Sequence, residues 1–275
     1  MGEANRKKQT RAALVAGRPC IYCGKPATSV EHMPPLSMFD GRRRPKGMEF
    51  PACDDCNSGT STADLVAGFM ARLDVDTPDE VWQSEEYLGR LRTIRKRAPG
   101  VVDELVGPQR AKPVLYTSPG GVLQRAVQIN ANGPIVQACL TVFTAKVAMA
   151  LYAEVMGERL PDEGGAMTWF YLNAGLQQAT AEKLLRLMPG GGTLKQGAFS
   201  VPDQFYYRHN FSMEHRVIMA LMSFHRGLHV FTLTSAEPGR WGMPDHEVPH
   251  GHFVRPGELY SRMPQRVPSA KRAKS

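Results

Sequence analysis

The chain lacks an apolar run that could span a bilayer without interruption. Its longest apolar stretch, residues 135–156, would have to contain almost only apolar side chains to serve as a membrane helix. Polar side chains interrupt it at Gln137, Thr141, Thr144, Lys146 and Glu154. The basic N-terminus also lacks the apolar segment that a secretory signal requires. We therefore expect a cytoplasmic protein that does not enter a membrane.

Cysteine is scarce, and no internal repeat is evident. Only five cysteines occur in 275 residues, and four of them form two Cys-x-x-Cys pairs. The fifth, Cys139, lies in the apolar stretch and is interpreted as a small core residue. Paired cysteines at metal-binding spacing, with one odd thiol and no signal segment, fit a reducing compartment.

Charge of one sign is in moderate excess. Lys and Arg outnumber Asp and Glu by 34 to 26, which gives a net charge of +8. A basic excess favours polyanionic partners, among which nucleic acid is the commonest. Many soluble proteins are mildly basic, so the charge alone decides little.

The two cysteine pairs are the strongest signal in the sequence. Cys20 and Cys23 form the first pair, and Cys53 and Cys56 form the second. Four thiolates at this spacing predict one tetrahedral structural Zn²⁺ site. The 29 residues between the pairs exceed the gap of a plain zinc ribbon and contain the dipeptide Glu31-His32.

Three residues beside the cysteines offer the groups that phosphodiester hydrolysis needs. Histidine is suited to remove a proton from water near neutral pH, and His32 supplies the imidazole. A divalent cation prefers hard oxygen ligands, which Glu31 and Asn57 supply. Glu31 and His32 are neighbours on an extended segment, so a local turn must bring both into one cleft.

These motifs, Cys-x-x-Cys, Glu-His-x-x-Pro-like and Cys-x-x-Cys-Asn, resemble the HNH endonuclease family over residues 19–73. The resemblance implies a ββα-metal fold and cleavage of DNA, with an RNA partner left open. It implies His32 as general base, and Glu31 and Asn57 as ligands of a catalytic Mg²⁺ or Mn²⁺. The helix from about Thr60 would be the helix of the motif.

The sequence departs from the family pattern in two places. The middle asparagine has no counterpart, because Met48-Glu49-Phe50 occupies its region, and no histidine follows Asn57. Asp64 could complete a metal shell, but it is interpreted as a charge that supports the helix N-terminus. Two alternatives stay open: a zinc-dependent nucleic-acid-binding protein without hydrolytic activity, and a zinc-scaffold adaptor.

Two further clusters have both a functional and a plain interpretation. The loop at residues 40–47 could contact a phosphate backbone or could be a solvated turn. Its cations are Arg42, Arg43, Arg44 and Lys46. The stretch His246–His252 could bind a second metal, but a solvated loop is favoured because no helical frame supports it.

The predicted fold class is α+β: a zinc-stapled ββα-metal module followed by a mixed α+β domain. The boundaries are a basic arm at 1–18, the module at 19–76, an α+β domain of unassigned role at 77–240, and a basic Pro/Gly/His-rich tail at 241–275. The second domain shows no catalytic motif, and the oligomeric state is left open. Helices are expected at 60–73, 78–97, 135–156 and 180–188, a linker at 98–113, and strands at 28–32, 122–129, 167–172, 205–209, 216–224 and 228–233.

Overall fold

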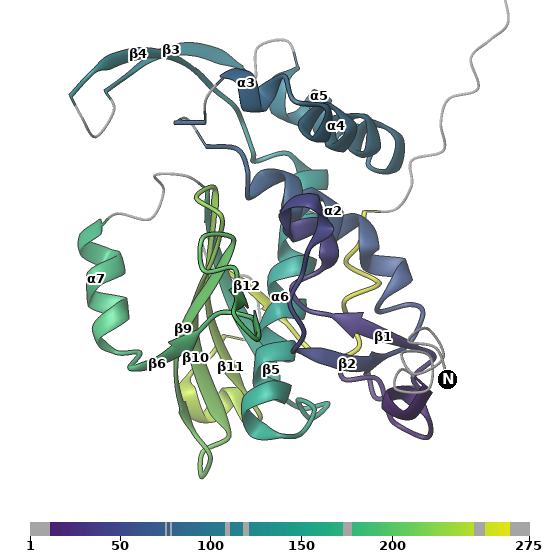
Figure 1. Ribbon diagram of the computed structural model, residues 1–275. Coiled ribbons are helices and arrows are strands. Elements are labelled where there is room, and N and C mark those ends of the chain that lie inside the picture. Colours follow the sequence, from purple (N-terminus) through teal and green to yellow (C-terminus); the bar gives the residue numbers. More distant parts are fainter. Residues whose placement is uncertain are drawn as a thin grey trace, which may run out of the picture.

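A six-stranded antiparallel sheet and one long helix form the centre of the structure (Figure 1). The computed structural model describes residues 12–74, 76–77, 79–107, 111–117, 121–172, 178–244 and 251–264. The sheet order is β12 (His252–Val254), β5 (Gly165–Leu172), β11 (Leu228–Ser235), β10 (Val217–Phe224), β9 (Phe205–Ser212) and β6 (Gly190–Gly192). The mixture of helices and strands confirms the predicted α+β class.

The long helix, α6 (Pro134–Met156), is apolar on all sides and packs on both sides. Proline at its first position and Gly157 at φ 73° just beyond its last mark its two ends. The Glu104 carboxylate accepts the first free backbone N–H groups, from Ile135 and Val136 at 3.0 and 2.9 Å. In the described part of the chain α6 alone is long and apolar enough to cross a membrane. Most of it is buried inside the protein, as in the core helix of a soluble protein.

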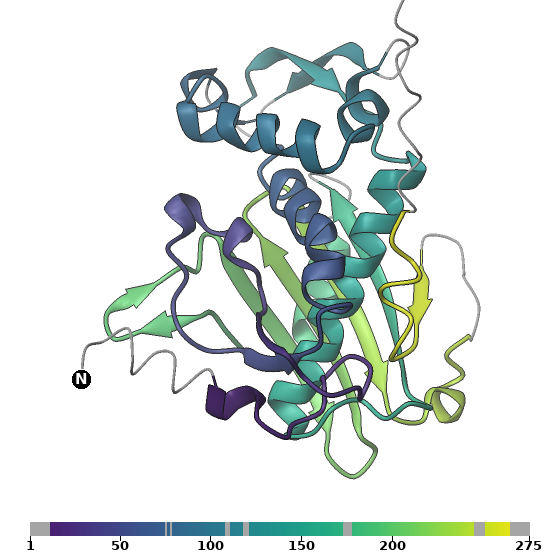
Figure 2. The same cartoon turned by 90° about the vertical axis from the view of Figure 1, so that its right-hand side faces the viewer.

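The cysteine-bearing segment lies on the side of α6 that faces away from the sheet, as the two perpendicular views show (Figures 1 and 2). It consists of the antiparallel hairpin β1 (Ser29–His32) and β2 (Glu49–Ala52), followed by η3 (Ser58–Thr60) and α2 (Ser61–Met70). Two short 3-10 turns, η1 (Leu36–Met38) and η2 (Asp40–Arg42), connect the strands. At Gly68 a side chain would lie 2.8 Å from the Ser37 carbonyl oxygen, so glycine allows this loop to lie directly on α2.

The remaining elements lie at the periphery. The helices α3 (Asp79–Trp82), α4 (Glu85–Arg97) and α5 (Val101–Val106) cover one end of α2 and α6, next to the hairpin β3 (Lys112–Thr117) and β4 (Leu123–Gln128) (Figure 1). The helix α7 (Gln178–Arg186), the small hairpin β7 (Lys195–Gln196) and β8 (Phe199–Ser200), and the 3-10 turn η5 (Pro238–Trp241) also belong to this half.

One large hydrophobic core crosses the predicted boundary at residues 76–77, and a smaller cluster of Met167, Met243 and Phe253 lies apart from it. Buried side chains from Cys20 to Leu259 form one continuous cluster. Backbone hydrogen bonds also join the parts: Gly227 N–H donates to Ala71 at 2.9 Å, and Gly257 N–H donates to Tyr22 at 2.8 Å. The inner face of the cysteine module is covered by α6 and the C-terminal segment.

Most predicted elements of the second half are present. The expected helix at 135–156 is α6, and the strands expected at 205–209, 216–224 and 228–233 are β9, β10 and β11, paired in that order. The helix expected at 78–97 is two helices, because Ser84 begins α4 by accepting the Tyr87 N–H.

Two predictions of irregular structure were wrong. The expected linker at 98–113 contains α5, whose Val101 and Leu105 are buried, and the first residues of β3. The expected tail from 241 contains β12, which pairs with β5 and buries Phe253 and Val254. Burial and pairing with distant residues decide both segments, and neither was visible in the local pattern.

We predict that Phe143→Ala destabilises the whole chain in one transition. Phe143 on α6 is fully buried and lies edge-on to Phe224 of the sheet, with ring centres 5.2 Å apart. Loss of such a ring costs about 3–5 kcal/mol. Urea unfolding, followed by far-UV circular dichroism and by zinc release, should show both signals shifting together. Leu115→Ala on β3, where the side chain is 67% exposed, is the control and should change stability by less than about 0.5 kcal/mol. If circular dichroism and zinc release had different urea midpoints, the module and the sheet would unfold separately, which would contradict a shared core.

Candidate zinc centre and the residues beside it

The four paired cysteines meet at one point beside the β1–β2 hairpin. Their Sγ atoms all lie within 4.8 Å of one another, and three of the four residues are buried. The Tyr22 N–H points at Cys20 Sγ, 3.4 Å away, as in a knuckle that supports a thiolate. Within the residues that the structure describes, this is the one group of three or more Cys, His, Asp or Glu side chains placed to hold a metal ion. Four sulfur ligands at this separation fit a tetrahedral Zn²⁺.

The pKa values of the clustered thiols are displaced in opposite directions. A hydrogen bond from the Cys56 thiol lowers the pKa of Cys20 to about 5, although burial opposes this shift. Burial raises the pKa of Cys23 to about 12, and the hydrogen bond to Cys20 together with burial raises that of Cys56 well above its usual value. Without a cation, one thiolate would therefore form at the expense of its neighbours. A bound Zn²⁺ removes this conflict because it stabilises all four thiolates.

The second cysteine pair fixes Asn57 against β1. Asn57 N–H donates to the Cys53 carbonyl at 3.0 Å, and its side-chain amide donates to Ser29 Oγ at 2.9 Å and to the Val30 carbonyl at 3.3 Å. The predicted proximity of Asn57 to the strand that carries Glu31 and His32 is thus present. The amide nitrogen, however, serves to attach the start of α2 to the start of β1.

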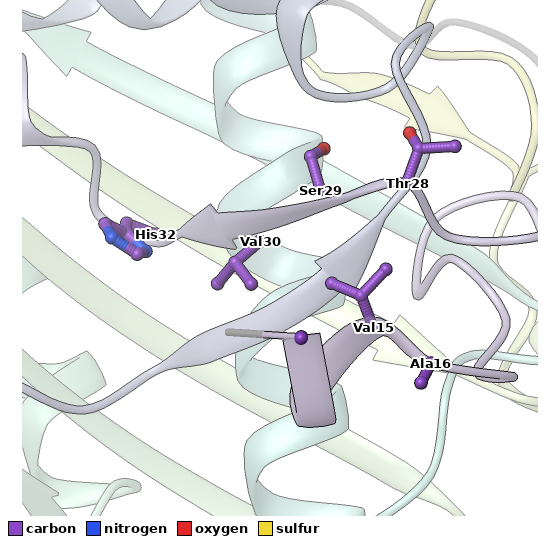
Figure 3. A pocket seen from close by; sticks show the side chains of 7 residues that line it. Val15, Ala16, Thr28, Ser29, Val30 and His32 are labelled. Atoms are coloured by element: carbon purple, nitrogen blue, oxygen red, sulfur yellow. The ribbon is translucent and has the colours of Figure 1, made fainter. Parts of the chain in front are cut away.

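His32 ends β1 and lines a pocket of about 560 Å³. The other lining residues come from β1 and from the short helical turn at residues 12–15 with the residue that follows it (Figure 3). Val30 lies on the same side of the strand as His32, with Val15 facing it across the pocket. The imidazole is half-buried, so a substrate on this side of the hairpin could reach it.

Glu31 points the other way, into the core. Only 3% of it is exposed, and its Oε2 lies 3.0 Å from Lys146 Nζ. Asp64 of α2 holds the same ammonium at 2.7 Å. Burial raises the pKa of Glu31 to about 7, with Lys146 opposing the shift and Asp64 adding to it. Burial alone would lower the pKa of Lys146, but the two carboxylates outweigh it and raise that pKa above its usual value.

The structure therefore does not bring the three predicted catalytic side chains into one cleft. Successive residues of a strand face opposite sides, and Figure 3 shows Ser29 and Val30 doing so. Glu31 shares the inner side with Ser29 and the Asn57 amide, whereas His32 lies on the pocket side. The turn that was expected to join Glu31 and His32 is absent, because β1 continues through His32 in register with Glu49.

Arg44 was one of four cations for which a nucleic-acid contact or a solvated turn was expected, and its guanidinium lies within the loop. Its guanidinium donates to the carbonyl groups of five residues in the β1–β2 connection, at 2.7–3.3 Å. Burial lowers its pKa to about 10. Arg44 thus holds the loop together, and Arg42, Arg43 and Lys46 remain exposed around it.

Three other interpretations can be compared with the structure. Cys139 is fully buried in α6, as expected of a core residue. Asp64 lies in the first turn of α2, but its carboxylate faces Lys146 and does more than support the helix end. Most of the stretch His246–His252 lies outside the described residues.

Lys146 was noted only as an interruption of an apolar run, although a lone lysine in such a run is itself a signal of a buried acidic partner.

Comparisons with protein-family models, with curated proteins and with solved structures find no match to this chain.

We predict that the wild-type chain binds one Zn²⁺ and that Cys53→Ser abolishes this binding. Metal binding at such a site is part of the folding free energy, so the variant should also melt at a lower temperature across the whole core. Elemental analysis and thermal denaturation measure the two effects. Cys139→Ala removes the cysteine outside the cluster and should keep the metal. Equal zinc content in Cys53→Ser and wild type would contradict the assignment.

We also predict that Glu31 makes stability fall as pH rises through neutrality. Its pKa in the folded chain is about 7, above the ordinary 4.5, so the folded state holds this proton more tightly than the unfolded state. Its contribution is present below the ordinary pKa and is lost as pH rises through the folded value. In excess zinc, the unfolding free energy of wild type relative to Glu31→Gln should fall by about 2–3 kcal/mol between about pH 5 and 8. Parallel urea-unfolding profiles for the two proteins would contradict this.

Proposed function

We propose that this protein is an HNH-type endonuclease that hydrolyses phosphodiester bonds in DNA, with His32 as the general base. The observation that carries the proposal is the half-buried imidazole of His32 at the end of β1, on the hairpin whose opposite end adjoins the four-cysteine cluster. This imidazole lines a pocket of about 560 Å³ on the outer side of the hairpin.

The order of elements supports this proposal. A hairpin, a cysteine pair and a helix follow one another as β1, β2, Cys53–Cys56 and α2, in the order that the resemblance implies. A structural Zn²⁺ would fix the two loops that carry the cysteines, and Asn57 attaches α2 to β1. His32 therefore lies on a hairpin held at both ends, which limits the movement of the base.

The distribution of cations also supports a polyanionic substrate. Arg42, Arg43 and Lys46 are exposed on the loop between the strands, and Arg95 and Lys96 are exposed at the end of α4. Arg97 donates to Ser61 Oγ at 2.8 Å, so the basic end of α4 lies beside the start of α2. Exposed cations on the connecting loop and at the end of α4 suit a phosphate backbone.

The catalytic Mg²⁺ or Mn²⁺ that the resemblance implies does not fit Glu31 and Asn57 as they stand. The Glu31 carboxylate already holds an ammonium in the core, and the amide of Asn57 is engaged with β1. We therefore assign no step to a divalent ion at these residues. His32 would remove the proton from the attacking water, and exposed cations would stabilise the phosphate charge.

A second candidate is a cytoplasmic nucleic-acid-binding protein that does not hydrolyse its partner. One observation favours it: the buried pair of Glu31 and Lys146 leaves His32 without a neighbouring carboxylate of the same dipeptide on its side of β1. On this view the zinc module and its exposed cations would bind the phosphate backbone, and His32 would contribute to binding alone.

We predict that zinc-loaded protein nicks or cuts plasmid DNA and that His32→Ala lowers the rate by at least about 100-fold, the usual contribution of a general base. Rates are measured with Mg²⁺, with Mn²⁺ and with no added divalent ion, at low salt. Zinc content and melting temperature should be unchanged in the variant. His215→Ala, in the turn between β9 and β10, is the matched histidine control and should cut like wild type.

The outcomes separate the candidates. Equal cutting by His32→Ala and wild type would refute the assignment of the base. Binding of DNA in a gel-shift assay at low salt, with no cutting under any metal condition, would favour the non-hydrolytic candidate. Absence of binding at low salt would favour a zinc-scaffold adaptor, because phosphate contacts are strongest there.

A further inference from the structure

One lysine ammonium is enclosed between two carboxylates at the meeting point of three elements. Lys146 lies in the middle of α6 and has no exposed surface. Its Nζ lies 3.0 Å from Glu31 Oε2 on β1 and 2.7 Å from Asp64 Oδ2 on α2. Both acidic residues are more than nine-tenths buried, so solvent screens these charges little.

The oxygen atoms around Lys146 Nζ can accept more hydrogen bonds than one ammonium donates, and the two acidic side chains can carry more negative charge than it neutralises. Two carboxylates face a single positive charge. The Asp64 Oδ1 atom and the Tyr22 hydroxyl are buried, and neither has a hydrogen-bond partner among the residues that the structure describes. The Tyr22 ring centre lies 6.0 Å from Lys146 Nζ. A buried site with two carboxylates and spare oxygen atoms has the chemistry of a divalent-cation site.

We propose that this site is a latent divalent-cation site in which the ammonium of Lys146 takes the place of the metal ion. The lysine neutralises Glu31 and Asp64 and joins β1 and α2 from behind, as a bridging Mg²⁺ or Mn²⁺ would. In the wild-type chain the site therefore binds no divalent ion. This inference goes beyond the proposed function, because it concerns which cation neutralises Glu31 and Asp64. It applies whether or not the protein hydrolyses DNA.

The distances make the exchange of cations feasible. A small divalent ion binds oxygen at about 2.0–2.2 Å, whereas the ammonium contacts are 2.7 and 3.0 Å. The carboxylates would need to move inward by less than about 1 Å each. Truncation of the lysine side chain would leave the space that the ion and its remaining water ligands need.

The test is a Mn²⁺ titration of zinc-loaded full-length protein, without nucleic acid, followed by electron paramagnetic resonance of free Mn²⁺. Wild type should bind no Mn²⁺ at this site. Lys146→Ala should gain one site, and Mn²⁺ should raise its melting temperature by several degrees. Lys146→Met is the matched control: it removes the charge but fills the space, so it should gain no site. Glu31→Gln or Asp64→Asn, added to Lys146→Ala, should abolish the gain.

Two results would overturn the proposal. The first is a Mn²⁺ site in wild type that Glu31→Gln removes, because the lysine would then not exclude the ion. The second is a failure of Mn²⁺ to bind, stabilise or refold Lys146→Ala. If Lys146→Ala is unfolded in zinc alone, recovery of its fold in Mn²⁺ supports the proposal. If Mn²⁺ does not restore the fold of Lys146→Ala, but the triple variant Lys146→Ala/Glu31→Gln/Asp64→Asn folds, the two carboxylates repel each other without binding an ion. That result contradicts the proposal. None of these measurements uses DNA cleavage, so their outcome is independent of the test of His32.

Discussion

The buried contact of Lys146 with Glu31 and Asp64 is the interaction on which the three layers of this protein depend. It joins β1 and α2 of the cysteine module to the central helix, whose other side carries the sheet. Removal of the lysine from this buried contact would leave two uncompensated carboxylates and cost about 3–5 kcal/mol. The contact therefore has to form for the module to dock, and once formed it determines which side of β1 faces inward.

The cysteine cluster and the lysine act at opposite ends of the same small module. A two-stranded hairpin is at best marginally stable alone, and β1 and β2 have four residues each. The four cysteines hold the loops at one end of the hairpin, while Lys146 holds the inner face of β1 near its other end. Beyond the Lys146 end, Arg44 satisfies the carbonyl groups of the loop that connects the two strands. The position of His32 follows from these three contacts together.

The predictions that succeeded rest on local rules, and those that failed depend on distant partners. Two Cys-x-x-Cys pairs have the spacing of a metal site and do converge, and the length and apolar character of the run at 135–156 predict a helix. The short strand β12 is specified by pairing with β5, about 90 residues earlier, and a Pro/Gly/His-rich composition conceals it. Lys146 and Asp64 are 82 residues apart, so neither charge identifies the other in the sequence.

The acid–histidine dipeptide shows why residue order alone does not define a catalytic centre. Adjacent side chains on a strand face opposite sides, so Glu31 and His32 can share a cleft only where the strand is broken between them. Here β1 stays regular through His32. The buried ammonium of Lys146 stabilises this arrangement because it holds the Glu31 carboxylate in the core. Glu31 attaches the strand to the core through Lys146, and His32 lines the pocket. The end of β1 can therefore hold a half-buried imidazole while the preceding carboxylate is buried against Lys146, so the proposed chemistry at His32 and the cation behind it are separate questions.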